Sequence, residues 1–141
     1  MKLHVQKSVY DQIVEHVKRS YPHECCGVLA GTIQGDVKHA VKAYPVKNLN
    51  QERAHDRYNM DPVGMIHVEK EIASLNFEII GIYHSHPDHP PRPSKTDFEF
   101  AWPVYSYIIF AVAKGVHIEA GNWCLNDPAT EFIPEPYELV E

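Results

Sequence analysis

Two histidines and an aspartate have the residue types and the spacing to hold a divalent metal ion. His84 and His86 end an apolar run, and a proline-rich loop at positions 87–93 separates them from Asp97. Side chains of an extended segment alternate between faces, so both imidazoles should point the same way. Two imidazoles, one carboxylate and a fourth position left to water form the ligand set of a catalytic zinc site.

Each half of this pattern also has a simpler interpretation. A His-x-His pair can pack half-buried beside a loop, and Ser94 with Asp97 is the pattern of a helix capping box. If Ser94 caps the helix, its hydroxyl only orients Asp97. The interpretations are compatible, because a capped helix fixes the direction of the carboxylate and the loop fixes its distance from the histidines.

The same residues carry a family resemblance. The run HSHP at 84–87, followed after six further residues by Ser94 and then Asp97, resembles the H-x-H-x7-S-x-x-D signature of the JAMM (MPN-plus) metalloproteases. That family also has an upstream glutamate before an apolar strand, and Glu24 stands in this position. The resemblance extends over about residues 21–125 and is closest to the small, stand-alone prokaryotic JAMM domains.

The resemblance implies a ligand set and roles for the remaining groups. His84, His86 and Asp97 would hold one Zn²⁺ per chain together with a water molecule. Glu24 would be the general base that takes the proton of that water. Ser94 would donate a hydrogen bond to the tetrahedral intermediate.

Spacing alone does not single out these catalytic groups. A lone glutamate in a turn is usually a solvated side chain, and spacing leaves other candidates open, namely Glu52, Glu69 and Glu78. Cys25 or Cys26 with His23 could also suggest a thiol nucleophile, but a buried cysteine is the more common outcome. Ser85 should face away from the histidines, and His89 should be exposed in the proline loop.

Length and composition restrict the class of protein. We expect one domain over residues 1–141, because a chain of this length can bury about two-thirds of its unfolded surface. A net charge of −6 argues against a nucleic-acid partner. The chain has neither an apolar run of about 20 residues nor a signal-peptide core, so we expect no membrane partner and a cytoplasmic location. The three cysteines do not indicate a disulfide framework.

Hydrophobic periodicity predicts helices and strands in alternation. The helix near the N-terminus should begin with a Ser8–Asp11 capping box, and the second should have Asp61 as N-cap with an apolar face formed by Met65, Ile66, Ile72, Ala73 and Leu75. A third helix should begin at Ser94. The predicted strands are 2–7, 27–33, 37–46, 77–83, 105–113, 116–120 and 122–125, with an edge strand within 131–138.

These elements predict an α/β fold with one curved, mixed or mainly antiparallel sheet and two or three flanking helices. The resemblance implies the same MPN/JAMM-like, cytidine-deaminase-like architecture. The strand at 77–83 is apolar on both faces, as in a central strand, so it should hold the histidines rigidly. The polar loop at 48–58 could form one wall of a substrate cleft.

The sequence thus predicts a zinc metallopeptidase that hydrolyses an amide or isopeptide bond. The resemblance implies a protein substrate with a flexible C-terminal tail, of the ubiquitin-like or sulfur-carrier type. The alternatives are a phage-tail peptidase acting on cell-wall-like peptides and a non-catalytic MPN scaffold that binds partner proteins, although such scaffolds usually lose metal ligands. A zinc deaminase is excluded, because its H-x-E…P-C-x-x-C signature is missing.

Overall fold

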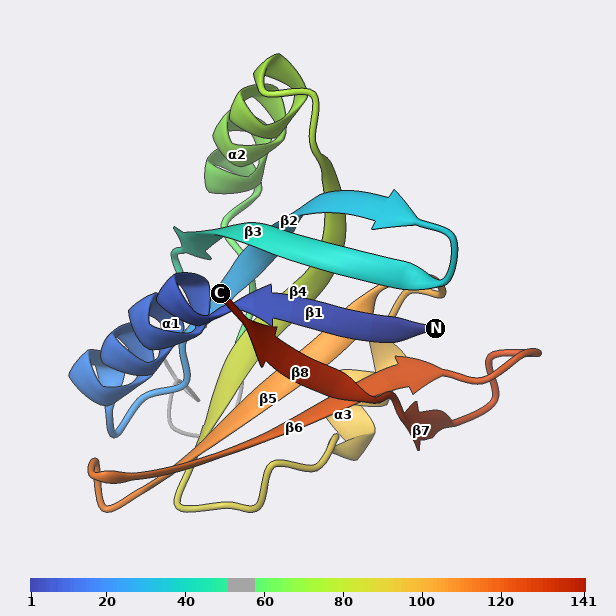
Figure 1. Cartoon of the computed structure of the whole chain (residues 1–141). Helices are drawn as coiled ribbons and strands as arrows, with labels where there is room; N and C mark the ends of the chain where they lie inside the picture. The colour runs from blue at the N-terminus through green and yellow to red at the C-terminus, as the bar shows by residue number, and fades with distance from the viewer. Residues whose placement is uncertain (51–57) are drawn as a thin grey trace.

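A computed structural model describes residues 1–50 and 58–141, and within them the chain forms one eight-stranded sheet and three helices (Figure 1). The helices are α1 (Lys7–Ser20), α2 (Pro62–Ser74) and α3 (Lys95–Glu99). The strands are β1 (Lys2–Gln6), β2 (Cys26–Gln34), β3 (Val37–Val46), β4 (Glu78–Pro87), β5 (Ser106–Ala113), β6 (His117–Leu125), β7 (Phe132–Pro134) and β8 (Tyr137–Val140).

The sheet is mixed and strongly curled, which confirms the predicted fold class. Its strand order is β7-β6-β5-β4-β2-β3-β1-β8, with parallel pairing of β1 to β3, β1 to β8 and β4 to β5. The outermost strands β7 and β8 are separated in sequence only by Glu135 and Pro136. The sheet must therefore curl until its two edges approach each other, as the positions of β7 and β8 in Figure 1 show.

A buried polar network lies where the two edges approach. The Lys38 ammonium on β3 donates to Ser106 Oγ at 2.9 Å and to Glu135 Oε2 at 3.2 Å. Ser106 donates to the second Glu135 oxygen, and Asn122 Nδ2 donates to the same oxygen at 2.9 Å. All four side chains are buried. A buried charge is tolerated when it is paired and hydrogen-bonded, and this network satisfies that condition.

Apolar residues cover both faces of the sheet. Val9, Ile13 and Val17 of α1 pack on one face, and Ile72 of α2 packs on the other beside Val28. The predicted face of α2 is only partly right, because Ile66 is 52% and Leu75 is 40% exposed while Ile72 is buried. Helix α2 contacts the sheet along a narrow stripe and stands away from it over much of its length (Figure 1).

Helix α1 begins differently from the prediction. Strand β1 runs directly into it at Lys7, and Gln6 at the N-cap position makes no side-chain capping bond. The predicted Ser8–Asp11 capping box is therefore wrong. Asp11 pairs instead with Lys7 Nζ at 3.0 Å, one helical turn earlier.

Strand β6 is continuous, whereas the sequence predicted two strands on either side of Gly121. Gly121 pairs with Ile109 inside the strand. A Cβ atom at this position would lie 2.5 Å from the Pro91 carbonyl oxygen, and Trp123 Nε1 donates to the same oxygen at 2.9 Å. The glycine thus marks a close approach of the proline-rich loop to the sheet rather than a turn.

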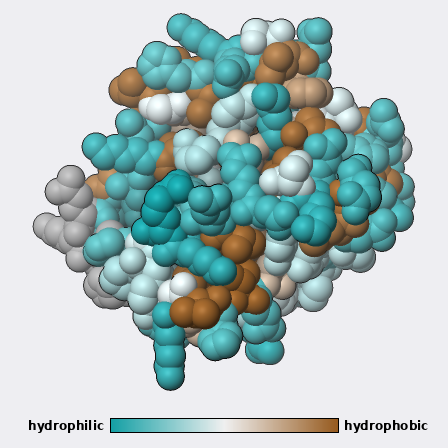
Figure 2. All heavy atoms as spheres, turned by 60° about the vertical axis from the view of Figure 1, so that its left-hand side comes forward, coloured by the Kyte–Doolittle hydropathy of each residue, from teal (hydrophilic) through white to brown (hydrophobic). Residues whose placement is uncertain are grey.

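The surface mixes polar and apolar residues. On the face seen in Figure 2, apolar side chains reach solvent as separate patches between hydrophilic ones. None of the helices in the described part of the chain is long and apolar enough to span a membrane.

Candidate metal centre

The two histidines project from the middle of the sheet. Strand β4 lies between β2 and β5 and continues to Pro87, so both residues belong to the strand itself. His84 and His86 point to the same face, with their Nε2 atoms 3.1 Å apart. Both are buried; His84 pairs with β2 and β5, and His86 pairs with β5.

Asp97 meets the histidines from the first turn of α3. Its Oδ2 atom lies 3.3 Å from His84 Nε2 and 3.2 Å from His86 Nε2. The three atoms thus form a nearly equilateral triangle. Four ligands placed tetrahedrally at about 2.0–2.1 Å from zinc are separated from one another by about 3.3–3.4 Å. Two imidazoles and one carboxylate at these distances fit three corners of a zinc site.

A capping box fixes the Asp97 carboxylate. Ser94 Oγ accepts from the Asp97 amide at 3.0 Å, and the Ser94 amide donates to Asp97 Oδ2 at 2.8 Å. The same carboxylate oxygen therefore caps the helix and faces both histidines. A hydroxyl that accepts one hydrogen bond can still donate another, so capping leaves Ser94 able to serve a second acceptor.

The proline-rich loop fixes the second histidine. His86 Nδ1 lies 2.9 Å from the Pro90 carbonyl oxygen. A proton on Nδ1 directed at that carbonyl leaves Nε2 as the lone-pair atom that faces Asp97 and His84. The next residue, Pro91, is held against β6 by Trp123, so the sheet indirectly supports the orientation of the imidazole.

Glu24 reaches the centre from the segment before β2. Its carboxylate and the two histidine rings offer ligand atoms within 4.8 Å of one another, and its side chain is buried. Three bonds hold the backbone here. Asn48 Nδ2 donates to the Glu24 carbonyl at 3.0 Å, the Cys25 amide donates to Ser85 Oγ at 2.9 Å, and the Ser85 amide donates to the Cys25 carbonyl at 3.1 Å.

The environment sets the charges of the three convergent groups. Burial lowers the pKa of His84, outweighing the opposing effect of Asp97. Burial also acts on His86, but the hydrogen bonds with Asp97 and Pro90 prevail and raise its pKa. Asp97 is partly desolvated as well, yet its bonds with His84 and His86 hold its pKa far below the usual range. The carboxylate is therefore ionised throughout the neutral range.

Other residues considered from the sequence lie elsewhere. Glu69 and Glu78 are exposed, and Glu52 lies outside the described residues. His89 is exposed, as expected. Burial raises the pKa of both Cys25 and Cys26, which disfavours a thiolate at either position.

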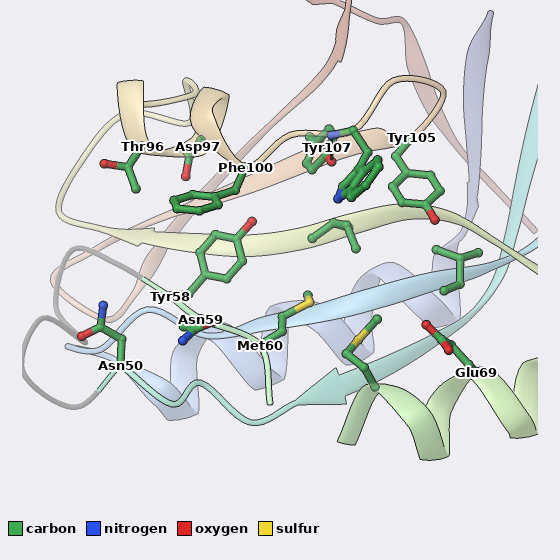
Figure 3. Close-up of a pocket in the computed structure, with 14 residues that line it drawn as sticks. Asn50, Tyr58, Asn59, Met60, Glu69, Thr96, Asp97, Phe100, Tyr105 and Tyr107 are labelled. Carbon is green, nitrogen blue, oxygen red and sulfur yellow. Dashed lines mark hydrogen bonds between the residues drawn. The ribbon is translucent and has the colours of Figure 1, made fainter. Parts of the chain in front are cut away.

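Two cavities meet at the centre. One has a volume of about 750 Å³, and Figure 3 shows Tyr58 and Phe100 beside Asp97, with Tyr107 farther along the cavity. The second has a volume of about 400 Å³ and is lined by Glu24, His86 and Ser94 together with polar and basic residues. Thr96 lines both cavities. Asp97 lines the first cavity and His86 lines the second, so each cavity includes one of the convergent side chains.

Two residues beside the centre belong to the loop at 48–58 that was predicted as a cleft wall, but no individual role was predicted for either. Asn48 bonds to the Glu24 backbone, and Tyr58 stacks on the His84 ring. Both lie at the ends of the polar segment predicted as a loop, of which residues 51–57 lie outside the described residues. No local pattern marks them, because both contacts join positions far apart in sequence.

Comparison with known proteins places the chain in a family. Residues 6–124 match the prokaryotic homologues of the JAB domain. The desampylase of Haloferax volcanii is 36% identical over 113 residues, covering 77% of this chain and 79% of the relative. The CysO-cysteine peptidase of Mycobacterium tuberculosis is 28% identical over 138 residues, covering 97% and 90%. A solution structure of a Desulfitobacterium hafniense protein matches with a TM-score of 0.86 at 27% identity, covering 99% and 93%.

The chain therefore belongs to the family of prokaryotic JAB-domain proteins. This finding confirms the resemblance to the JAMM (MPN-plus) metalloproteases.

Proposed function

We propose that the chain is a zinc-dependent metallopeptidase that cleaves an amide or isopeptide bond at the C-terminus of a ubiquitin-like or sulfur-carrier protein. The observation that carries this proposal is the triangle formed by His84 Nε2, His86 Nε2 and Asp97 Oδ2, with sides of 3.1–3.3 Å. In our proposal these three side chains hold one zinc ion. A zinc ion bound there would supply a water that ionises near neutral pH and would polarise the substrate carbonyl.

Glu24 is the proposed general base. Its carboxylate lies in the same buried group as the histidines and lines the polar cavity. It would accept a proton from the attacking water as the oxygen bonds to the carbonyl carbon. The same proton would then pass to the amine nitrogen as the carbon–nitrogen bond breaks, so that one carboxylate serves both steps.

Ser94 is the proposed donor to the developing oxyanion. It lines the polar cavity together with Glu24 and His86. Its amide donates to Asp97 Oδ2 at 2.8 Å and its hydroxyl oxygen accepts from the Asp97 amide at 3.0 Å, so little reorganisation is needed during the reaction.

The two cavities support an extended substrate. The aromatic cavity has the size and apolar lining to hold the tail of the acyl-side protein, with Phe100 and Trp102 on its wall. The polar cavity would receive the amine side, where Arg92 and Lys95 also lie. We extend the substrate class from the relatives whose names specify a desampylase and a CysO-cysteine peptidase. We also propose a cytoplasmic location, which agrees with the free thiols of Cys25, Cys26 and Cys124.

Incubation with defined conjugates tests the proposal. Sulfur-carrier fusions and ubiquitin-like conjugates, each with a C-terminal extension, are incubated with the zinc-loaded protein and analysed by mass spectrometry. We expect a single cut after the carrier's C-terminal residue, abolished by a chelator and restored by zinc. Intact substrates throughout, with zinc bound, would leave the non-catalytic scaffold as the better assignment. Cleavage of cell-wall peptides alone would favour the alternative peptidase class.

A further inference from the structure

The two histidines of the centre are held in different ways. His86 has the usual arrangement for a metal ligand, because Nδ1 faces the Pro90 carbonyl oxygen at 2.9 Å. His84 Nδ1 is buried and has no hydrogen-bond partner among residues 1–50 and 58–141. A histidine that ligates a metal nearly always donates its second ring N–H to an acceptor that fixes its orientation. Something else must orient the His84 ring.

An aromatic ring occupies the neighbouring position. Tyr58 stacks on His84 with a centroid separation of 4.6 Å and an interplanar angle of 29°. The imidazole beneath it is fully buried. Figure 3 shows the Tyr58 side chain projecting into the aromatic cavity toward Phe100. One side of the tyrosine therefore belongs to the cavity wall, and the other covers the imidazole.

We propose that Tyr58 is a positioning residue, which orients His84 for metal binding by ring stacking in place of a hydrogen bond. This inference rests on the proposed metal site. The torsion that turns an imidazole about its Cβ–Cγ bond has broad wells, so an unanchored ring turns easily and Nε2 loses its direction. A flat ring packed against it blocks that rotation. It also keeps water away from the unpaired Nδ1 atom.

The contact makes the ring, and not the hydroxyl, the important part of Tyr58. Phenylalanine can stack in the same way, whereas leucine keeps an apolar side chain without a flat face and alanine opens the site. Tyr58→Phe should therefore retain the zinc affinity of the parent protein. Tyr58→Leu and Tyr58→Ala should weaken it, by about 10- to 100-fold if the stack has the importance of an ordinary supporting contact.

Competition with a chromophoric zinc chelator measures the affinity without any substrate. Phe100→Ala is the control, since Phe100 lines the same cavity but is 74% exposed. Circular dichroism of the metal-free variants tests whether each is folded, and Tyr58→Leu remains informative if Tyr58→Ala does not fold.

In the metal-free protein, long-range ¹H–¹⁵N spectra of His84 report the ring tautomer. We expect a single Nε2-protonated form, which donates to Asp97 Oδ2, in the parent and in Tyr58→Phe, and mixed forms in Tyr58→Leu.

The outcomes separate this inference from the proposed function. Loss of affinity in Tyr58→Leu with retention in Tyr58→Phe and Phe100→Ala would support it. Parent-like affinity in Tyr58→Leu, or equal loss in Tyr58→Phe, would overturn it while leaving the metal site intact. A parent protein that binds no zinc at all would instead contradict the proposed function.

Discussion

The Cys25 amide donates to Ser85 Oγ at 2.9 Å, and the Ser85 amide donates in return to the Cys25 carbonyl at 3.1 Å. Ser85 lies between the two histidines of β4, while Cys25 follows Glu24 directly in the chain. Two reciprocal bonds thus fix the position of the proposed base relative to the proposed metal ligands. Because the serine is fully buried and lines neither cavity, it can do this without contacting the substrate.

Removing the Ser85 hydroxyl should disturb the position of Glu24 without removing the metal. Ser85→Ala leaves the buried Cys25 amide without an acceptor, at a cost of about 1–3 kcal/mol in the free energy of unfolding. We expect a lower melting temperature and reduced kcat, with zinc still bound at about one per chain. Ser74→Ala is the control, because that hydroxyl is exposed at the end of α2. Unchanged stability and kcat in Ser85→Ala would contradict this role.

Glu24→Gln should retain zinc and lose turnover. The amide has nearly the same shape but cannot carry the proton, so kcat should fall by about 10²- to 10⁴-fold. Steady-state kinetics and metal analysis of the same sample give both quantities. The exposed Glu78→Gln variant provides the matched control. Normal turnover in Glu24→Gln would require a different base.

Asp97→Asn should abolish stoichiometric zinc binding, as should replacement of His84 or His86 by alanine. An amide oxygen can still cap the helix but carries no negative charge to hold the cation. Asp61→Asn makes the same substitution at the N-cap of α2, far from the proposed ligands in sequence, and should bind zinc normally. Elemental analysis after gel filtration measures the zinc content of each variant. Full zinc content in all three ligand variants would remove the proposed site.

Zinc affinity should fall as the pH is lowered. The two proposed histidine ligands bind the metal as neutral imidazoles. Burial lowers the pKa of His86, but its bonds with Asp97 and Pro90 prevail and raise it. A proton should therefore compete with the metal from somewhat above pH 6.5 downwards. In the metal-free protein, the contribution of His86 to folding stability depends on pH in the opposite direction. The contribution of His86 to folding stability is complete below its unfolded pKa and is lost as the pH rises through the folded one.

Chelator competition between pH 5 and 8, corrected for the chelator's own titration, measures this dependence. The metal-free protein, unfolded by denaturant over the same range, shows the opposite trend if His86 dominates. An affinity that stays constant over these three pH units would mean that His86 is not a ligand.

The aromatic cavity should contribute to substrate binding rather than to the chemical step. Trp102→Ala removes a large wall residue that is 69% exposed, so KM should rise several-fold while kcat changes little. Val116 is a suitable control, because it is 62% exposed and lines neither of the two cavities. A kcat that fell as far as kcat/KM would place Trp102 in the chemical step instead.

Local signals in the sequence predicted those parts of the structure that depend on neighbouring residues. Asp61 caps α2 with Pro62 at its first position, and Ser94 forms a capping box with Asp97, both as predicted. Strand β3 has the predicted bounds. Each of these features is complete within a few residues, so the sequence contains its full cause.

Features that depend on distant contacts were not predictable in this way. Gly121 resembles a strand break until the proline-rich loop is seen to pack on it. Asn48 and Tyr58 look like ordinary polar-loop residues until Glu24 and His84 are placed beside them. The role of Glu24 itself rests on family resemblance, because no spacing rule connects it with a strand so far along the chain.

The last residues of the chain follow the segment that matches the family, residues 6–124, yet they complete the interior of the protein. Glu135 supplies the counter-ion of Lys38, and β8 pairs in parallel with β1. Ending an expression clone at the C-terminal family boundary, residue 124, would leave the Lys38 charge buried without its partner and uncover β1. Clones for biochemical work should therefore keep these residues.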